Sequence, residues 1–411
     1  DALPILPSIV SGSSLAFLDP HEKYFKQGET GRRFDLAGEL LTSYKDQFSP
    51  YENVLDCKIS QGRYEGTLFR FPLRNKPSKL STKLYSTERV KELFEVFKEE
   101  AGIILLFLKN VEEISLYETN ETLKEKRLFA VKVSIDCVEE VRKRRKQFLE
   151  EAEELLYSED SECAVKPMKV TIVESSSSAK HDWFVCNCVS TEDKRLQELS
   201  AKLKLPPWIG IARPLNGSNC EALDKSGGRI FCFLPLPPDV HTGLPVHING
   251  SFGLTDNRRG LKWPGPECRD DAAEWNELLL KEVGSLAYKM LLLYLKTVFH
   301  NCPNQSKVDE FFKAWPDLSR VQREWLPMLN AMFTDLIHEE VFYTGINGGT
   351  WTKPEDSIVE RLTYSFSSDV RKCVTTLLQD ALLPVVSLPD HLLTIVDNYM
   401  SEWVKMVEPS I

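Results

Sequence analysis

The chain has 411 residues, of which 42% are hydrophobic and 27% are charged. This composition is typical of a folded globular protein and excludes a disordered or fibrous one, while the length predicts two or three domains. The formal net charge of -10 argues against nucleic-acid binding, because it repels a phosphate backbone. The longest apolar run, residues 101–108, is far below the roughly 20 residues that span a bilayer, which argues against a membrane span.

The ten cysteines are scattered, without a CxxC pair or the spacing of a disulfide framework. This pattern is typical of reduced thiols, so we expect a cytoplasmic protein. Cys186 and Cys188 alternate on an expected strand, but no second pair lies near them in the sequence, and no metal site is predicted.

Short apolar segments bounded by turn residues predict strands at residues 15–18 and 67–73. A helix is expected next, since Ser86 or Thr87 can cap its start and Gly102 can end it. Apolar residues at helical spacing would form its one apolar face: Val90, Leu93, Phe94 and Phe97.

The wholly apolar run at residues 103–108 and the alternating segments near residues 114–116 and 129–135 predict a small sheet. A second long helix is expected over residues 137–157, with charged residues on one face. Its apolar face would contain Val138, Val141, Phe148, Ala152 and Leu155.

Further strands are expected at residues 169–173, 183–189, 229–234 and 246–248. From residue 270 the pattern becomes helical, with helices expected at residues 272–300, 307–314, 321–338, 368–378 and 390–404. The segment Pro264-Gly265-Pro266 would join the mixed region to this helical part, because prolines interrupt a helix.

A basic run at residues 142–146 (RKRRK) lies on the second expected helix and has glutamates on both sides. A nuclear address or an anion-binding patch are alternatives for it. Charge pairs between residues three or four apart on a solvated helix face are the simpler interpretation.

The most distinctive stretch runs from residue 246 to residue 263 and reads VHINGSFGLTDNRRGLKW. Its candidate ligand-binding residues are Asn257, Arg258, Arg259 and Lys262, which could bind phosphate or carboxylate by charge-assisted hydrogen bonds. A structural role, in which the arginine pair anchors the helical domain electrostatically, remains the alternative. No P-loop, GxSxG or kinase-like motif occurs, so no catalytic residue is assigned.

Five segments together resemble the repeat unit of the sacsin family. They are LPSIVSG at residues 6–12, LAFLDPH at 15–21, GTLFRFPLR at 66–74, the stretch described above, and AEWNELLL at 273–280. The resemblance extends in this order along essentially the whole chain.

The resemblance implies an α+β fold in three parts. Residues 1–80 would be the C-terminal strands of a truncated GHKL-type domain, similar to the ATPase domain of the ninety-kilodalton heat-shock chaperone. Residues 81–264 would form a mixed α/β middle domain and residues 265–411 a helical domain. The family's nucleotide-binding residues lie upstream of the LPSIVSG segment, so no cofactor is expected here, while ATP and Mg²⁺ stay open for a complete repeat.

The implied function is that of a non-catalytic module of a giant cytoplasmic chaperone, which binds protein clients or other repeats of the same chain. One alternative is a part of an ATP-hydrolysing module, in which Arg258 or Arg259 would reach the terminal phosphate. Another is an architectural spacer without clients. Assembly into a homo-oligomer is left open.

Overall fold

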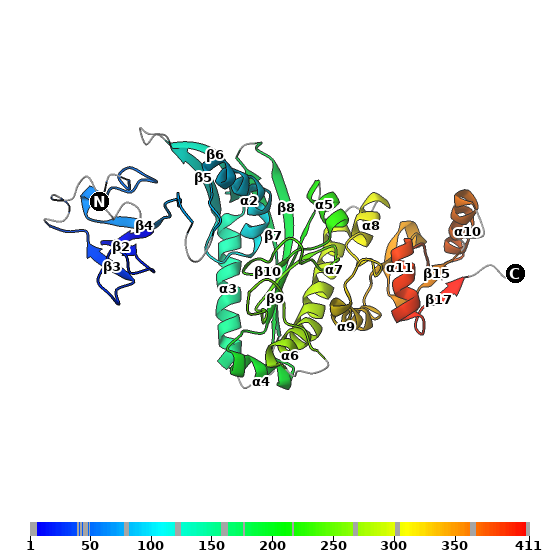
Figure 1. The fold of residues 1–411 in the computed structure, drawn as a ribbon. Coiled ribbons are helices and arrows are strands. Elements are labelled where there is room, and N and C mark those ends of the chain that lie inside the picture. Colours follow the sequence, from blue (N-terminus) through cyan, green and yellow to red (C-terminus); the bar gives the residue numbers. More distant parts are fainter. Residues whose placement is uncertain are drawn as a thin grey trace. The chain divides into compact units, whose positions relative to one another are not determined.

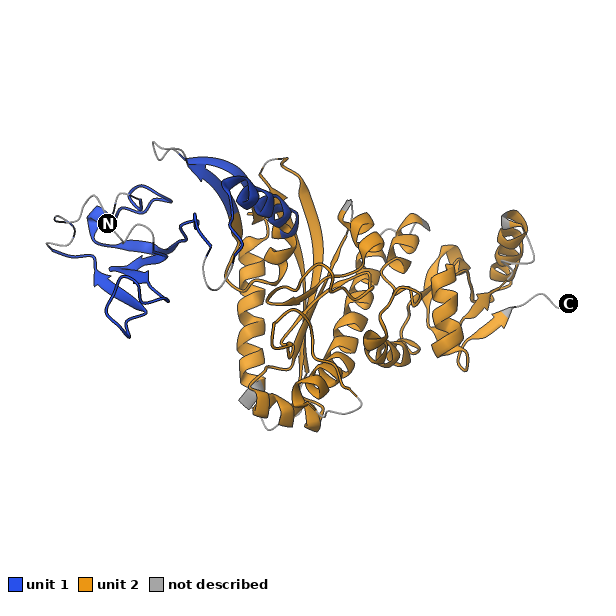
Figure 2. Ribbon diagram, viewed as in Figure 1, with its two compact units in different colours: residues 1–100, 115–130 blue, residues 101–114, 131–411 orange. Residues whose placement is uncertain are grey.

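The computed structural model describes residues 6–38, 41, 43, 48, 50–77, 82–119, 125–157, 163–175, 177–215, 218–265, 270–300, 305–361 and 367–407. Contacts divide the chain into two compact units (Figure 2): unit 1 contains residues 1–100 and 115–130, and unit 2 contains residues 101–114 and 131–411. The three-domain division expected from the sequence stays a prediction.

Unit 1 contains an antiparallel sheet with the strand order β3-β2-β1-β4. Its strands are β1 (Ser8–Gly12), β2 (Ser14–Leu18), β3 (Gly31–Asp35) and β4 (Tyr64–Arg70). Alternation along β1 and β2 buries Val10, Leu15 and Phe17 in a core shared with Tyr51. The strand expected at residues 15–18 is confirmed, and the one expected at residues 67–73 ends at Arg70.

The helix expected to end at Gly102 continues, as α2, from Thr87 to Phe107. The prediction of a strand at residues 103–108 was therefore wrong. A short apolar run fits a buried helix as well as a strand, and here Ile104, Leu105 and Leu106 are buried. Burying each such side chain stabilises the fold by about 1.5–3 kcal/mol, which outweighs the roughly 1 kcal/mol that a glycine costs inside a helix.

The central structure is an eight-stranded sheet with the order β11-β10-β12-β9-β8-β7-β6-β5 (Figure 1). Its strands are β5 (Glu113–Thr119), β6 (Glu125–Val133), β7 (Cys163–Glu174), β8 (Lys180–Ser190), β9 (Trp208–Pro214), β10 (Ile230–Cys232), β11 (Leu234–Pro235) and β12 (His247–Gly250). The strands expected in these regions are confirmed. Every residue of β9 is buried, so this strand is covered on both faces.

Helices of unit 2 cover the two faces of this sheet. On one face, α3 (Val138–Tyr157) packs Phe148 against Trp208. On the other face, the core joins Ile209 and Cys186 to a continuous helical stretch. That stretch consists of α6 (Asp271–Leu278), a π-helical segment (Leu279–Gly284) and α7 (Ser285–His300). Two shorter helices, α4 (Lys194–Leu203) and α5 (Ser218–Ser226), join the strands.

The last part of the chain contains α8 (Gln305–Phe312), α9 (Leu326–Leu336), α10 (Ser368–Asp380), and α11 (Asp390–Ile395) with the π-helical turn Val396–Met400. It also contains a five-stranded sheet, so the prediction of a purely helical last third was wrong. These strands are β13 (Phe342–Thr344), β14 (Thr350–Thr352), β15 (Ile358–Glu360), β16 (Val385–Val386) and β17 (Lys405–Val407). Strands of two or three residues are too short to produce a detectable alternation.

The mixed α+β class expected from the sequence is confirmed by these sheets and helices. Short 3-10 segments occur at Ile59–Gln61, Arg323–Trp325, Ile346–Gly348 and Pro354–Asp356. Within the described ranges, no helix combines the length and the apolar composition that crossing a bilayer requires.

Candidate functional site

The arginine loop, residues 253–263, follows β12 and leads toward α6. It folds back on itself, because Leu254 bridges Leu261 and the Thr255 amide donates to the Gly260 carbonyl at 2.9 Å. The Asn257 carboxamide closes the tip: its Oδ1 accepts from the Thr255 hydroxyl at 2.8 Å and from the Arg259 amide at 3.0 Å. Asn257 therefore shapes the turn.

Helix α6 anchors the arginine loop through Asn276, which is completely buried. The Asn276 amide nitrogen donates to the carbonyls of Gly253 and Lys262, each at 2.8 Å, and its Oδ1 accepts from the Gly253 amide at 2.8 Å. The neighbouring Trp275 indole donates to the Ser251 carbonyl at 2.7 Å. Loop and helix thus form one hydrogen-bonded unit, which is held by Asn276 and Trp275 and not by the arginine pair that the structural alternative invoked.

Lys262 also has a structural partner. Its ammonium lies 2.8 Å from the carboxylate of Asp270, the N-cap residue of α6. The hydrogen bond from Lys262, aided by the backbone amide of Ala272, lowers the pKa of Asp270 below its usual value. Lys262 therefore joins the end of the arginine loop to the start of the helix.

Arg258 and Arg259 are exposed, as is Asn257 at the tip of the arginine loop. Arg258 has a left-handed backbone conformation, with φ of 55°. Within the described ranges, neither guanidinium group makes a hydrogen bond or an ion pair. Asn257 and Lys262 have structural partners of their own, and the role of the four candidates in binding stays a prediction.

The charge pairs expected for the basic run are present on α3. Arg142 lies 2.8 Å from Glu139, Arg144 lies 2.5 Å from Glu140, and Lys146 lies 3.6 Å from Glu150. Arg145 differs, because only 7% of its surface is exposed. Arg145 lies four residues after Val141 and three before Phe148, which places it on the apolar face of the helix. This spacing could have identified Arg145 as a buried residue from the sequence.

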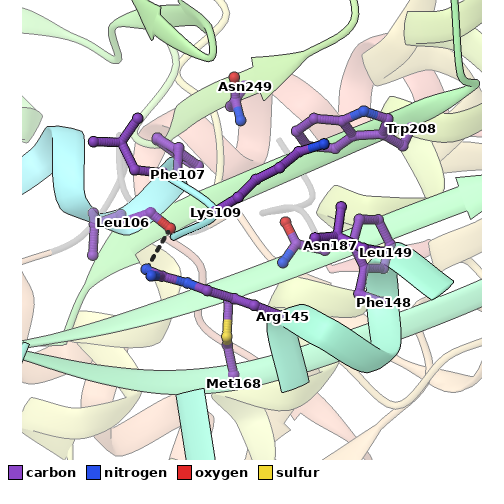
Figure 3. A pocket seen from close by; sticks show the side chains of 11 residues that line it. Leu106, Phe107, Lys109, Arg145, Phe148, Leu149, Met168, Asn187, Trp208 and Asn249 are labelled. Carbon is purple, nitrogen blue, oxygen red and sulfur yellow. Dashed lines mark hydrogen bonds between the residues drawn. The ribbon is translucent and has the colours of Figure 1, made fainter. Parts of the chain in front are cut away.

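Arg145 lines a pocket between the end of α2, α3 and the sheet (Figure 3). Its Nη2 donates to the carbonyls of Leu105 and Leu106 at 2.6 and 3.5 Å. These carbonyls belong to the last turn of α2, where a helix carries partial negative charge. Burial lowers the pKa of Arg145 below its usual value, although the charge of Glu112 acts in the opposite direction.

Three strands form the floor of this pocket. Gly210 of β9 is paired with Asn187 of β8 on one side and with Asn249 of β12 on the other. A Cβ atom at Gly210 would lie 2.5 Å from the Asn187 Oδ1, so the glycine makes room for the Asn187 carboxamide. The Asn249 Oδ1 accepts from the Phe233 amide at 2.9 Å, but its Nδ2 is buried and has no partner among the described residues.

The pocket walls are apolar and its opening is basic. Phe107, Phe148 and Trp208 are more than nine-tenths buried, and the rings of Phe148 and Trp208 meet edge to face with centroids 5.9 Å apart. Lys109 extends across the opening (Figure 3), with its ammonium 5.4 Å from the centre of the Phe233 ring. This site could not be predicted from the sequence, because its residues come from six segments that are distant in sequence.

The apolar face of α2 predicted from the sequence is present, but in unit 1 it is exposed. Leu93, Phe94 and Phe97 are 47%, 42% and 40% exposed, and the adjacent Val96 is 58% exposed. Phe69 and Phe71, at the end of β4, are also exposed, and their rings are stacked with centroids 6.2 Å apart. Contiguous exposed apolar side chains are typical of interaction surfaces.

Cys186 and Cys188 are buried in the sheet, and burial raises the pKa of Cys186 to about 12. Both side chains therefore contribute to packing as neutral thiols. Among the residues that the structure describes, no three His, Cys, Asp or Glu side chains form a group that could bind a metal ion.

Comparison with known proteins supports the resemblance noted in the sequence. A family model described as the Sacsin domain matches residues 3–130. Sacsin of Homo sapiens is 37% identical over 362 aligned residues, which cover 82% of this chain but 8% of the relative. The chain therefore spans less than a tenth of that relative's length, and the alignment reaches well beyond the part matched by the family model. These two matches and the five quoted segments together show that the chain belongs to the sacsin family.

Proposed function

We propose that the chain is a non-catalytic binding module of a chaperone of the sacsin type, and that it binds exposed apolar segments of non-native polypeptides. The observation that carries this proposal is the exposed face of α2, where Leu93, Phe94, Val96 and Phe97 lie together on one helix. A helix face of this kind buries apolar surface when a client segment packs on it, at about 25 cal/mol per Å².

Two further parts of the proposal follow from the family resemblance. Residues 1–80 would be the later strands of a GHKL-type ATPase-like domain, which the antiparallel sheet of β1 to β4 supports. The module would act in the cytoplasm in protein quality control, and the described cysteines, which are free thiols, fit a reducing compartment. Its partners would be clients or other repeats of the parent chain.

The proposal is tested by the affinity for a permanently unfolded probe, reduced and carboxymethylated α-lactalbumin, measured by fluorescence anisotropy. The double variant Leu93→Asp, Phe94→Asp should bind the probe at least about tenfold more weakly, since charged groups at the contact remove apolar burial. Lys143→Glu changes the net charge by the same amount at an exposed position of α3 and should leave binding unchanged. Equal affinities of wild type and double variant would reject the α2 face as the binding surface.

A second candidate function is part of an ATP-hydrolysing module, and the exposure of Arg258 and Arg259 favours it. In a complete repeat, one of these side chains would stabilise the terminal phosphate during hydrolysis. Arg258→Ala should then change the hydrolysis rate of the complete repeat without changing its melting temperature. Position 258 has a φ of 55°, and alanine, which carries a Cβ as arginine does, meets the same backbone restriction there. An unchanged rate would exclude this role.

A further inference from the structure

The pocket under α3 contains a buried cation without a buried counter-ion. No described carboxylate lies within 4 Å of Arg145, and the hydrogen bonds of its guanidinium go from Nη2 to two main-chain carbonyls. Glu112, whose charge acts on Arg145, is itself bound by Arg142 through two hydrogen bonds of 2.8 Å. A buried charge is costly unless it is paired, so the pocket favours an anion.

A second observation at the same place points to a hydrogen-bond acceptor. The Asn249 side chain is 1% exposed, and its Nδ2 lacks a partner among the described residues. In Figure 3 this nitrogen points into the pocket, on the side opposite Arg145. Buried amide donors are normally satisfied, and an acceptor placed between Asn249 and Arg145 would satisfy this one.

The shape and lining limit what the acceptor can be. None of the residues that line the pocket is acidic, and Lys109 adds a second cation at the opening. The cavity measures about 40 Å³, room for about three water molecules, so it admits a carboxylate group with a short stem and excludes a nucleotide. The aromatic side chains of Phe107, Phe148 and Trp208 provide apolar walls.

We propose that this pocket binds a carboxylate group carried on a short apolar stem. The carboxylate oxygens accept hydrogen bonds from the Arg145 guanidinium and the Asn249 Nδ2, and the Lys109 ammonium approaches from the opening. The stem packs between the aromatic walls formed by Phe107, Phe148 and Trp208. Either a free short-chain acid or the carboxyl terminus of a peptide supplies this chemistry. The site lies in unit 2 and is independent of the α2 face proposed for clients.

Met168 lines the pocket and offers a local probe. In protein labelled with ¹³C at the methionine methyl groups, the Met168 resonance is assigned by its loss in Met168→Leu. Titration with propionate should shift this resonance saturably, and titration with propionamide, which lacks the charge, should not. A tripeptide ending in leucine distinguishes the two sources. If the form with a free carboxyl terminus binds more tightly than propionate, the ligand is a peptide terminus. The amidated form, which lacks the carboxylate, is the control.

Two variants and one control test the assignment of residues. Asn249→Asp keeps the acceptor for the Phe233 amide but places a negative charge where the ligand carboxylate would lie, and should weaken propionate binding by at least about tenfold. Lys109→Gln changes an exposed side chain and should weaken propionate binding about threefold. Lys143→Gln removes a charge from the exposed face of α3 and should have no effect.

The proposal is overturned if neither propionate nor the free-terminus peptide shifts the Met168 resonance saturably, because the pocket then holds water only. It is also overturned if propionamide binds as well as propionate, or if Lys109→Gln leaves the affinity for propionate unchanged. Because Lys109 is exposed, its variant keeps the test decisive even if Asn249→Asp does not fold.

Discussion

At the scale of single residues, Asn276 explains why the arginine loop and the AEWNELLL segment occur together in the chain. Its three hydrogen bonds to Gly253 and Lys262 add to the backbone pairing of the arginine loop and join that loop to α6. Removing this side chain leaves buried main-chain groups without partners.

Asn276→Ala should therefore lower the free energy of unfolding by about 3 kcal/mol, measured by urea denaturation. Asn330→Ala, at an exposed position of α9, is the matched control and should cost less than about 0.5 kcal/mol. A loss at Asn276 no greater than that of the control would contradict the anchoring role.

A buried histidine makes the stability depend on pH. His247 accepts a hydrogen bond at Nδ1 from the Arg229 amide at 3.0 Å, so it is neutral in the fold. Burial, together with the charges of Arg229 and Arg213, lowers the pKa of His247 from 6.5 to about 3. Below pH 6.5 the unfolded chain binds a proton that the folded chain does not, so the stability is complete above pH 6.5 and declines as the pH falls toward 3.

Between pH 7 and pH 5 this one group should remove about 2 kcal/mol from the free energy of unfolding. His247→Asn retains an acceptor for the Arg229 amide and should lose this part of the pH dependence, as measured by urea denaturation at both pH values. His338 is exposed, so the control variant His338→Asn should keep this part of the pH dependence. The same pH dependence in wild type and His247→Asn would refute the assignment.

At the scale of elements, helix α2 shows a conflict between local propensity and packing. Gly102 is a reasonable helix end in isolation, yet the helix continues because the apolar residues after it are buried. A Cβ atom at Gly102 would meet Ile172 at 3.5 Å and Val131 at 3.7 Å, which are ordinary contact distances.

Gly102→Ala should consequently stabilise the protein by about 0.5–1 kcal/mol, seen as a higher urea midpoint. Gly228→Ala is the contrasting variant, since a Cβ there would overlap the Val246 carbonyl oxygen, and it should destabilise by about 3 kcal/mol. Destabilisation by Gly102→Ala would mean that α2 is not a continuous helix at this position.

Elements whose hydrophobic pattern extends over many residues could be predicted. Helix α3 and strands β7 and β8 were expected from helical spacing and alternation, and all three are present. The strands β13 to β17 were not, because two or three residues cannot establish a period. The continuation of α2 was missed for another reason: whether an apolar run packs as helix or strand depends on neighbours that are distant in sequence.

At the scale of the whole molecule, residues far apart in sequence make the pocket. Arg145 could have been found from its place on the apolar face of α3, but its carbonyl partners lie about 40 residues earlier in the chain. Asn187, Gly210 and Asn249 become neighbours only through the register of three strands. Register is set by tertiary packing, so one sequence does not reveal such a site.

The central claim is that this chain binds non-native polypeptides without turnover, and aggregation of a heat-denatured model enzyme tests it most directly. Light scattering is followed with the chain at an equimolar ratio, with and without ATP and Mg²⁺. The account predicts suppression by wild type, the same suppression with nucleotide, and loss of suppression in Leu93→Asp, Phe94→Asp. No suppression by wild type would contradict the claim and favour an architectural spacer, and suppression only with ATP would contradict its non-catalytic part.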